Sequence, residues 1–140
     1  MTKNIDTRNL NPGFILIADD DIDDQELLGE AFYTVNNLLH LEFIHNGNKL
    51  ILYLEKLLDN ELPSLIVLDY NMPELNGVEI LKVLNKVGRY KAIPKIVWST
   101  SNSSVYKNMS LDLGAADYIV KPSDLASFER IAKHLLSLIN

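Results

Sequence analysis

Cysteine is absent from this 140-residue sequence, which excludes disulfide bridges and metal sites built on thiolates. Long apolar runs are absent as well. No segment approaches the roughly 20 apolar residues of a membrane span, and the polar start lacks the apolar stretch of a secretory signal peptide. We therefore expect a soluble, intracellular protein located in the reducing cytoplasm.

Positive charge is also scarce. The chain has 13 Lys and Arg residues against 19 Asp and Glu residues, and its net charge is −6. Nucleic acids and anionic membranes attract basic surfaces, so neither is expected as a main partner. The excess of carboxylates is instead compatible with binding cations.

Apolar residues make up 47% of the chain, which is enough for one hydrophobic core. Residues 1–13 are polar and end in the turn sequence Asn11-Pro12-Gly13, so we expect a loose N-terminal leader there. Residues 14–140 are expected to form a single domain.

Five short apolar segments alternate with segments of helical periodicity. The expected strands are Phe14–Ala18, Leu41–Ile44, Leu65–Asp69, Lys95–Ser99 and Asp117–Val120. The expected helices cover about 24–36, 47–58 and 78–87, then a segment from a cap within 101–104 to Gly114, and a last segment after a cap at Ser123 or Asp124. Leu57 and Leu58 are assigned to the inner face of the second helix, and Gly88 is expected to end the third.

Strands that alternate with helices imply right-handed parallel crossovers, with helices on both faces of the sheet. The sequence thus predicts an α/β fold with a doubly wound, five-stranded parallel sheet. A flavodoxin-like strand order of 2-1-3-4-5 places the first and third strands side by side at the switch point, where ligands bind.

Carboxylates follow both of these strands. Asp19 and Asp20 come directly after the first strand and Asp69 ends the third, so the fold brings them together. Like charges this close raise a pKa or recruit a cation, and oxygen ligands suit Mg²⁺. Taken alone, Asp69 is more readily interpreted as a cap of the following turn, and the other strand ends favour the site. Asp23 and Asp24 are interpreted as a solvated helix start, and Asp21 fits either role.

Two further strand ends carry polar groups that could act on a phosphoryl group. Ser99 closes the fourth strand with a hydroxyl, and Lys121 follows the fifth strand with an ammonium group. Three carboxylates balance one Mg²⁺ and one lysine, so an incoming phosphoryl group would meet a neutral site. An Asp carboxylate can serve as a covalent nucleophile, and metal and lysine can stabilise the transferred oxygens.

The sequence resembles the receiver domain of two-component response regulators from Phe14 to Asn140. The resemblance lies in FILIADDD, LIVLDYNMPELNG, IPKIVWST and GAADYIVKP. It implies that Asp69 is phosphorylated by a histidine kinase or phosphotransfer protein. It also implies that Asp20 and Asp69 bind Mg²⁺ directly, Asp19 through water, and Asn71 through its backbone carbonyl.

The same resemblance implies further roles. Ser99 takes the place of the switch hydroxyl, although Thr100 follows it and offers a second one. Lys121 contacts the phosphoryl group, and the Lys121–Pro122 peptide bond is expected to be cis. Tyr118 is the aromatic switch of the output face. That face comprises the fourth helix, the fifth strand and the fifth helix, and contacts an unidentified downstream protein.

The leading hypothesis is a stand-alone receiver that signals by protein contact. Its own chemistry is at most Mg²⁺-dependent self-phosphorylation from small phosphodonors and autodephosphorylation. One alternative is a pseudo-receiver or adaptor that works without phosphorylation. Another is an aspartyl-phosphate hydrolase, but that class needs an acid at position 71, where this chain has Asn71. A flavin-binding domain is less compatible with the Asp-rich first turn.

Overall fold

The computed structural model describes residues 14–139, so the expected leader at residues 1–13 lies outside the described part of the chain. The five strands are parallel and form one sheet in the order β2-β1-β3-β4-β5. Their bounds are β1 Phe14–Ala18, β2 His40–Ile44, β3 Leu65–Asp69, β4 Lys95–Ser99 and β5 Asp117–Val120. The predicted fold class and strand order are confirmed.

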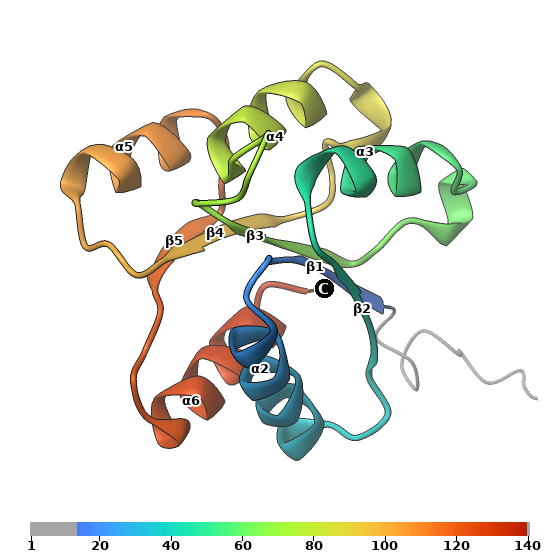
Figure 1. The fold of residues 1–140 in the computed structure, drawn as a ribbon. Coiled ribbons are helices and arrows are strands. Elements are labelled where there is room, and N and C mark those ends of the chain that lie inside the picture. The colour runs from blue at the N-terminus through green and yellow to red at the C-terminus, as the bar shows by residue number, and fades with distance from the viewer. Residues whose placement is uncertain (1–13, 140) are drawn as a thin grey trace, which may run out of the picture.

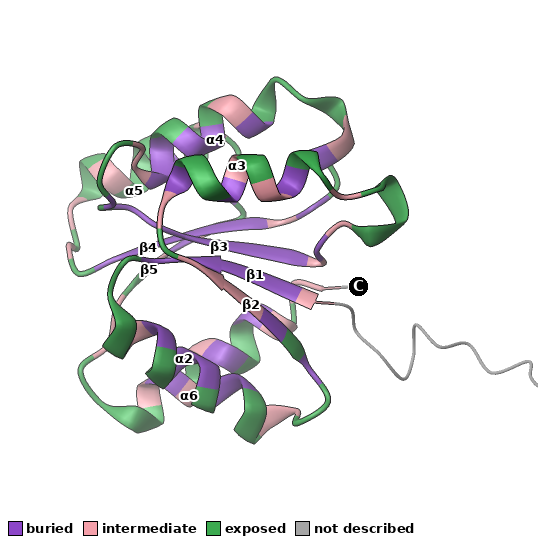
Figure 2. Ribbon diagram, turned by 45° about the vertical axis from the view of Figure 1, so that its right-hand side comes forward, coloured by how far each residue is buried: buried purple, intermediate pink, exposed green. Residues whose placement is uncertain are grey.

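Helices cover both faces of the sheet (Figure 1). Figure 2 shows α2 and α6 on one side of it and α3, α4 and α5 on the other. The helix bounds are α2 Ile22–Val35, α3 Gly47–Glu55, α4 Gly77–Asn85, α5 Ser104–Asp112 and α6 Leu125–Leu136, with short 3-10 helices η1 Asp59–Glu61 and η2 Gly88–Tyr90. Among these described helices, none is both long and apolar enough to cross a membrane.

The central strands explain the two-layered core. Every residue of β3 and β4 is buried, because both faces of these strands are covered by helices. Leu16, Ile66 and Val97 point toward the α3, α4 and α5 layer, and Ile17 and Trp98 toward α2 and α6. Trp98 is only 1% exposed and meets Phe128 edge to face, so it fills the core as its position in the strand predicts.

Several predicted helix ends are wrong. α3 ends at Glu55, and Leu58 is 65% exposed instead of facing the core; Leu57 is only partly buried. α4 ends at Asn85, so Gly88 does not terminate it and instead begins η2. In both cases apolar residues that follow a helix continued its periodic pattern, although the chain had already turned back toward the sheet.

The first helix starts earlier than predicted. Asp21 caps α2, since its side chain accepts a hydrogen bond of 3.1 Å from the backbone N–H of Asp24. Asp24 therefore stands on the first turn of α2. This places its carboxylate close to the carboxyl ends of the strands.

Candidate functional site

Three carboxylates meet at the carboxyl edge of the sheet. β1 pairs directly with β3, so Asp19, which follows β1, lies beside the end of β3, where Asp69 is the last residue. Oxygen atoms of Asp19, Asp20 and Asp69 all lie within 4.8 Å of one another. Asp19 and Asp69 are 0% and 4% exposed, whereas Asp20 is exposed and leaves the cluster open to solvent. The predicted convergence of these three residues is what the structure shows.

Backbone groups hold the two buried carboxylates in place. Asp19 Oδ1 accepts a 2.8 Å hydrogen bond from the N–H of Asp21, and Asp69 Oδ1 accepts a 3.1 Å bond from the N–H of Asn71. The side-chain amide of buried Gln25 donates to the backbone carbonyl of Asp19. These bonds fix the orientation of the carboxylates before any ligand binds.

Lys121 is the counter-charge of the cluster. Its Nζ lies 3.0 Å from Asp19 Oδ2, 2.8 Å from Asp24 Oδ2 and 3.2 Å from Asp69 Oδ2. Burial by itself lowers the pKa of Lys121, but its hydrogen bond to Asp24 and the charges of Asp19 and Asp69 raise that pKa above its ordinary value. Lys121 is therefore a permanent cation at neutral pH.

Asp24 was missed as a site residue. Its interpretation as part of a solvated helix start is wrong, because it makes the shortest of the ion pairs with Lys121. The sequence carried no clear signal for this contact, because it depends on where α2 begins. Asp23 is exposed, as expected for a helix start.

The Lys121–Pro122 peptide bond was expected to be cis and is trans, since the described residues contain no cis peptide bond. The trans form of a bond to proline is the favoured one by roughly 0.5–1 kcal/mol. Lys121 reaches all its carboxylate partners with this bond in the trans form.

The carboxyl group of Asp69 is a weaker acid than an ordinary aspartate, because its pKa is raised. Burial, and next the charge of Asp19, raises the pKa of Asp69 to about 7, against the lowering effect of Lys121. The ionised carboxylate is thus held in the folded protein at a cost, and a cation that binds beside it offsets this cost.

We expect Asp69→Asn to be more stable than the wild type by about 1–3 kcal/mol at pH 7.5 without divalent cations, because the amide removes a charge whose folded pKa is raised. A carboxyl group whose pKa is higher in the folded than in the unfolded protein lowers the stability of the fold as pH rises from the unfolded-state pKa to the folded-state pKa. The advantage of Asp69→Asn should accordingly shrink as pH falls from about 7 to about 4. Urea unfolding of both proteins in EDTA across this range measures it, and an advantage that grows toward low pH would contradict the assignment.

Ser99 and Tyr118 lie on the neighbouring strands. Ser99 is fully buried at the end of β4, and its hydroxyl accepts a 3.1 Å hydrogen bond from the N–H of Ser101. Thr100 is exposed. Tyr118 is 7% exposed, and its hydroxyl donates to the Ser101 carbonyl at 2.7 Å. The aromatic ring already points inward, and the loop after β4 connects it to Ser99.

The donor set fits a hard divalent cation. The converging groups of Asp19, Asp20 and Asp69 are all oxygens, and buried Asp19 Oδ2 accepts no well-directed hydrogen bond from the residues described, although Lys121 is near. Mg²⁺ prefers oxygen ligands and retains several waters, which exposed Asp20 leaves room for.

Comparisons with known sequences agree with this geometry. The profile of the response regulator receiver domain family matches residues 15–133. The two-component response regulator ORR5 of rice (Oryza sativa) is 37% identical over 73 residues, which are 52% of this chain and 54% of that protein. The CpxR homolog of Haemophilus influenzae, a transcriptional regulatory protein, is 36% identical over 110 residues, 77% of this chain and 43% of that protein. This chain thus spans about half the length of such relatives.

Solved structures resemble the whole domain. The phosphorylated cyanobacterial phytochrome response regulator RcpA superposes with a TM-score of 0.81 at 27% identity, covering 91% of this chain and 96% of that one. The Mn²⁺-bound form of response regulator Rcp1 gives a TM-score of 0.78 at 26% identity, with 90% and 93% of the two chains covered. The chain belongs to the response regulator receiver domain family.

Proposed function

We propose that this protein is a cytoplasmic receiver that accepts a phosphoryl group on Asp69 from a histidine kinase or a phosphotransfer protein. One observation carries the proposal. The Asp69 carboxylate stands at the sheet edge beside the carboxylate oxygens of Asp19 and Asp20, and its Oδ2 lies 3.2 Å from the Nζ of Lys121. A carboxylate oxygen of Asp69 attacks phosphorus, and the bond from phosphorus to the donor's histidine nitrogen breaks. The donor leaves with that electron pair, and an acyl phosphate remains on Asp69.

The surrounding residues have distinct tasks in this proposal. Mg²⁺, when bound, neutralises the phosphoryl oxygens; Asp20, Asp69 and the Asn71 carbonyl would hold it directly, and Asp19 through water. Lys121 stabilises the oxygens that gain negative charge during transfer. Because Asp24 adds a fourth carboxylate at Lys121, the site with one Mg²⁺ carries one net negative charge instead of none. Asp24 thus keeps Lys121 fixed but partly offsets its attraction for phosphate.

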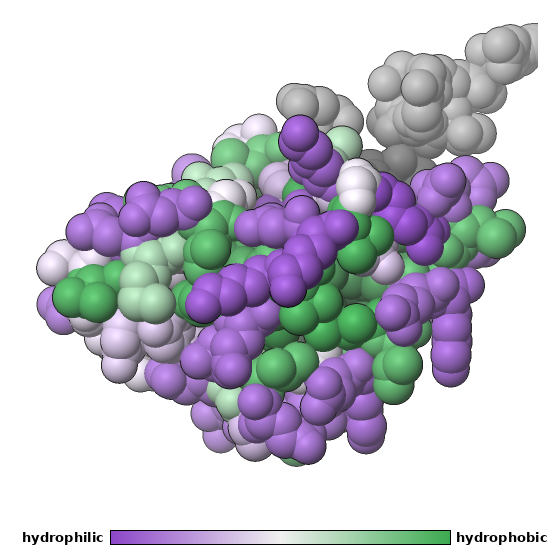
Figure 3. Space-filling model, turned by 90° about the horizontal axis from the view of Figure 1, so that it is seen from above, coloured by the Kyte–Doolittle hydropathy of each residue, from purple (hydrophilic) through white to green (hydrophobic). Residues whose placement is uncertain are grey.

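Signalling would pass through the loop after β4. A hydrogen bond from Ser99, or from Thr100, to the phosphoryl group pulls on the loop whose Ser101 carbonyl binds Tyr118. Phosphorylation then favours one packing of α5 against β5. The surface formed by α5, β5 and α6 has exposed apolar side chains that a downstream protein could contact: Val105, Met109, Val120 and Leu125. Figure 3, seen from the side of α3, α4 and α5, shows hydrophobic side chains among the charged ones over α5.

The test is a mass measurement after incubation with Mg²⁺ and acetyl phosphate, a small phosphodonor. We expect one added phosphoryl group on the wild type and none on Asp69→Asn. Asp23→Asn is the matched control, since Asp23 belongs to the same acidic run but not to the cluster, and should be phosphorylated normally. EDTA should abolish the reaction.

Equal mass gain in Asp69→Asn, or none in the wild type, would overturn the proposal. Partner binding that is unchanged in Asp69→Asn would favour an adaptor that works without phosphorylation. Steady turnover of a simple phosphomonoester that requires Asp69 would favour a hydrolase.

A further inference from the structure

A second polar site lies at the opposite edge of the sheet, where the strands begin. A cavity of about 640 Å³ opens there between the end of α4, η2 and the end of α5. Its volume falls within the range of small-molecule sites, roughly 300–1,000 Å³. Asp69, at the carboxyl end of β3, does not line it. The walls are mixed, and their larger apolar members are Leu84, Val87, Ile93, Pro94, Leu113 and Leu138.

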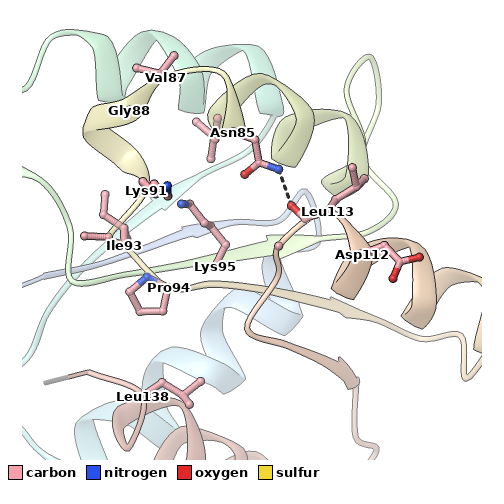
Figure 4. A pocket seen from close by; sticks show the side chains of 13 residues that line it. Asn85, Val87, Gly88, Lys91, Ile93, Pro94, Lys95, Asp112, Leu113 and Leu138 are labelled. Atoms are coloured by element: carbon pink, nitrogen blue, oxygen red, sulfur yellow. Dashed lines mark hydrogen bonds between the residues drawn. The ribbon is translucent and has the colours of Figure 1, made fainter.

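A buried lysine projects into this cavity. Lys95 is the first residue of β4 and only 4% exposed, and Figure 4 shows its side chain extending from the strand toward the wall formed by Asn85 and Lys91. Its Nζ donates one hydrogen bond, to the Tyr90 carbonyl. Within residues 14–139, no carboxylate forms an ion pair with Lys95. An ammonium group has three donors, so two of them are free to bind a ligand.

The charges around Lys95 leave this ammonium uncompensated. Burial lowers the pKa of Lys95, as expected for a cation without a partner charge. Asp112 lines the cavity but is exposed, and exposed Lys91 adds a second positive charge at the same wall.

Nearby helix carbonyls do not supply the missing partner. The ends of α4 and α5 lie here, and carbonyls at a helix end attract cations. Here they are largely occupied: Leu113 O accepts from the Asn85 amide, Leu111 O from Gly114 N, and Leu84 O from Val87 N. Among residues 14–139, the buried ammonium therefore has the Tyr90 carbonyl as its hydrogen-bond partner and no carboxylate in direct contact.

We propose that this cavity binds a small organic carboxylate. Its carboxylate accepts the two free Nζ–H donors of Lys95 and is attracted by Lys91, and its apolar body lies against Leu84, Ile93 and Leu113. A charge-assisted bond in a buried site favours the anion over an uncharged analogue of equal size. The proposal is independent of phosphorylation at Asp69, because the two sites lie at opposite ends of the strands.

The test compares hexanoate with hexanamide by NMR titration of the ¹⁵N-labelled full chain. We expect saturable shifts for hexanoate at the amides of Ile93, Leu113 and Gly114, and binding of hexanamide that is about tenfold or more weaker. Lys95→Met keeps the length of the side chain without its charge and should weaken hexanoate binding by a similar factor. Lys86→Met is the matched control, since Lys86 is exposed and does not line the cavity, and should bind as the wild type does.

Equal binding of the acid and the amide would overturn the proposal, as would undiminished hexanoate binding by Lys95→Met or shifts that do not saturate. If Lys95→Met does not fold, the comparison of acid and amide on the wild-type protein decides alone. Phosphorylation of Asp69 is measured by mass in a separate experiment and should proceed equally in wild type and Lys86→Met. A failed hexanoate titration would therefore overturn the carboxylate site and leave the receiver function untouched.

Discussion

Replacing Lys121 by Met is expected to lower the free energy of unfolding by about 3–5 kcal/mol in the absence of divalent cations. Lys121 is buried among Asp19, Asp24 and Asp69, at distances of 3.0, 2.8 and 3.2 Å. Methionine fills the same space but leaves these carboxylates without their cation. Desolvated charges that lose their partner are among the most destabilising changes a protein can undergo.

Urea unfolding with and without Mg²⁺ measures this effect. A divalent cation at the acidic cluster replaces part of the lost positive charge, so millimolar Mg²⁺ should recover more stability in Lys121→Met than it adds to the wild type. Lys107→Met, at an exposed position on α5, is the matched control and should stay within about 0.5 kcal/mol of the wild type. A loss below about 1 kcal/mol in Lys121→Met would show that the carboxylates do not depend on this lysine.

Replacing Gly77 by Ala is expected to destabilise the protein by about 2–3 kcal/mol and to slow phosphorylation of Asp69. A Cβ at position 77 would lie 2.8 Å from the backbone carbonyl oxygen of Asp69 and 3.2 Å from the Cα of Tyr70. These are backbone atoms, and the Gly77 N–H donates a 3.1 Å hydrogen bond to the Tyr70 carbonyl. Neither the backbone at Gly77 nor the end of β3 can therefore move away freely. The methyl group would displace the end of β3 and the carboxylate that it carries.

Gly88→Ala is the matched control, because a Cβ there would meet no atom within 4 Å. It should leave stability within about 0.5 kcal/mol of the wild type. Urea unfolding and the time course of the acetyl phosphate reaction measure both variants. Wild-type stability and an unchanged rate in Gly77→Ala would mean that the loop after β3 adapts at no cost.

The sheet could be predicted from the sequence because its strands are unambiguous. FILIA, LIVLD and KIVWS are apolar throughout, and the helices between them impose parallel connections. Helix ends were less predictable. Leu58 and Val87 continue the spacing of the preceding helix, but whether a residue after the last turn faces the core depends on the path of the chain, which periodicity does not contain.

The acidic cluster followed from strand ends alone, since Asp19 and Asp69 occupy the termini of neighbouring strands. The contact between Asp24 and Lys121 joins residues 97 positions apart and depends on where α2 begins. An error of two residues in that start turned a site carboxylate into a solvated one. Lys95 was missed for another reason: a lysine at the start of a strand is usually exposed, whereas here it is 4% exposed and donates to the Tyr90 carbonyl of η2.

The position of Lys121 in the sequence has a consequence for how the protein is made. Asp19, Asp24 and Asp69 leave the ribosome well before Lys121, which follows the last strand and lies 97 positions after Asp24. Until β5 docks beside β4, the growing chain has an acidic edge without its lysine, and ions of the surrounding solution must offset the repulsion. The segment that contains β5 and Lys121 brings the lysine of the acidic cluster as well as the last strand of the sheet, so we expect the nascent chain to reach its stable fold only after this segment has been synthesised.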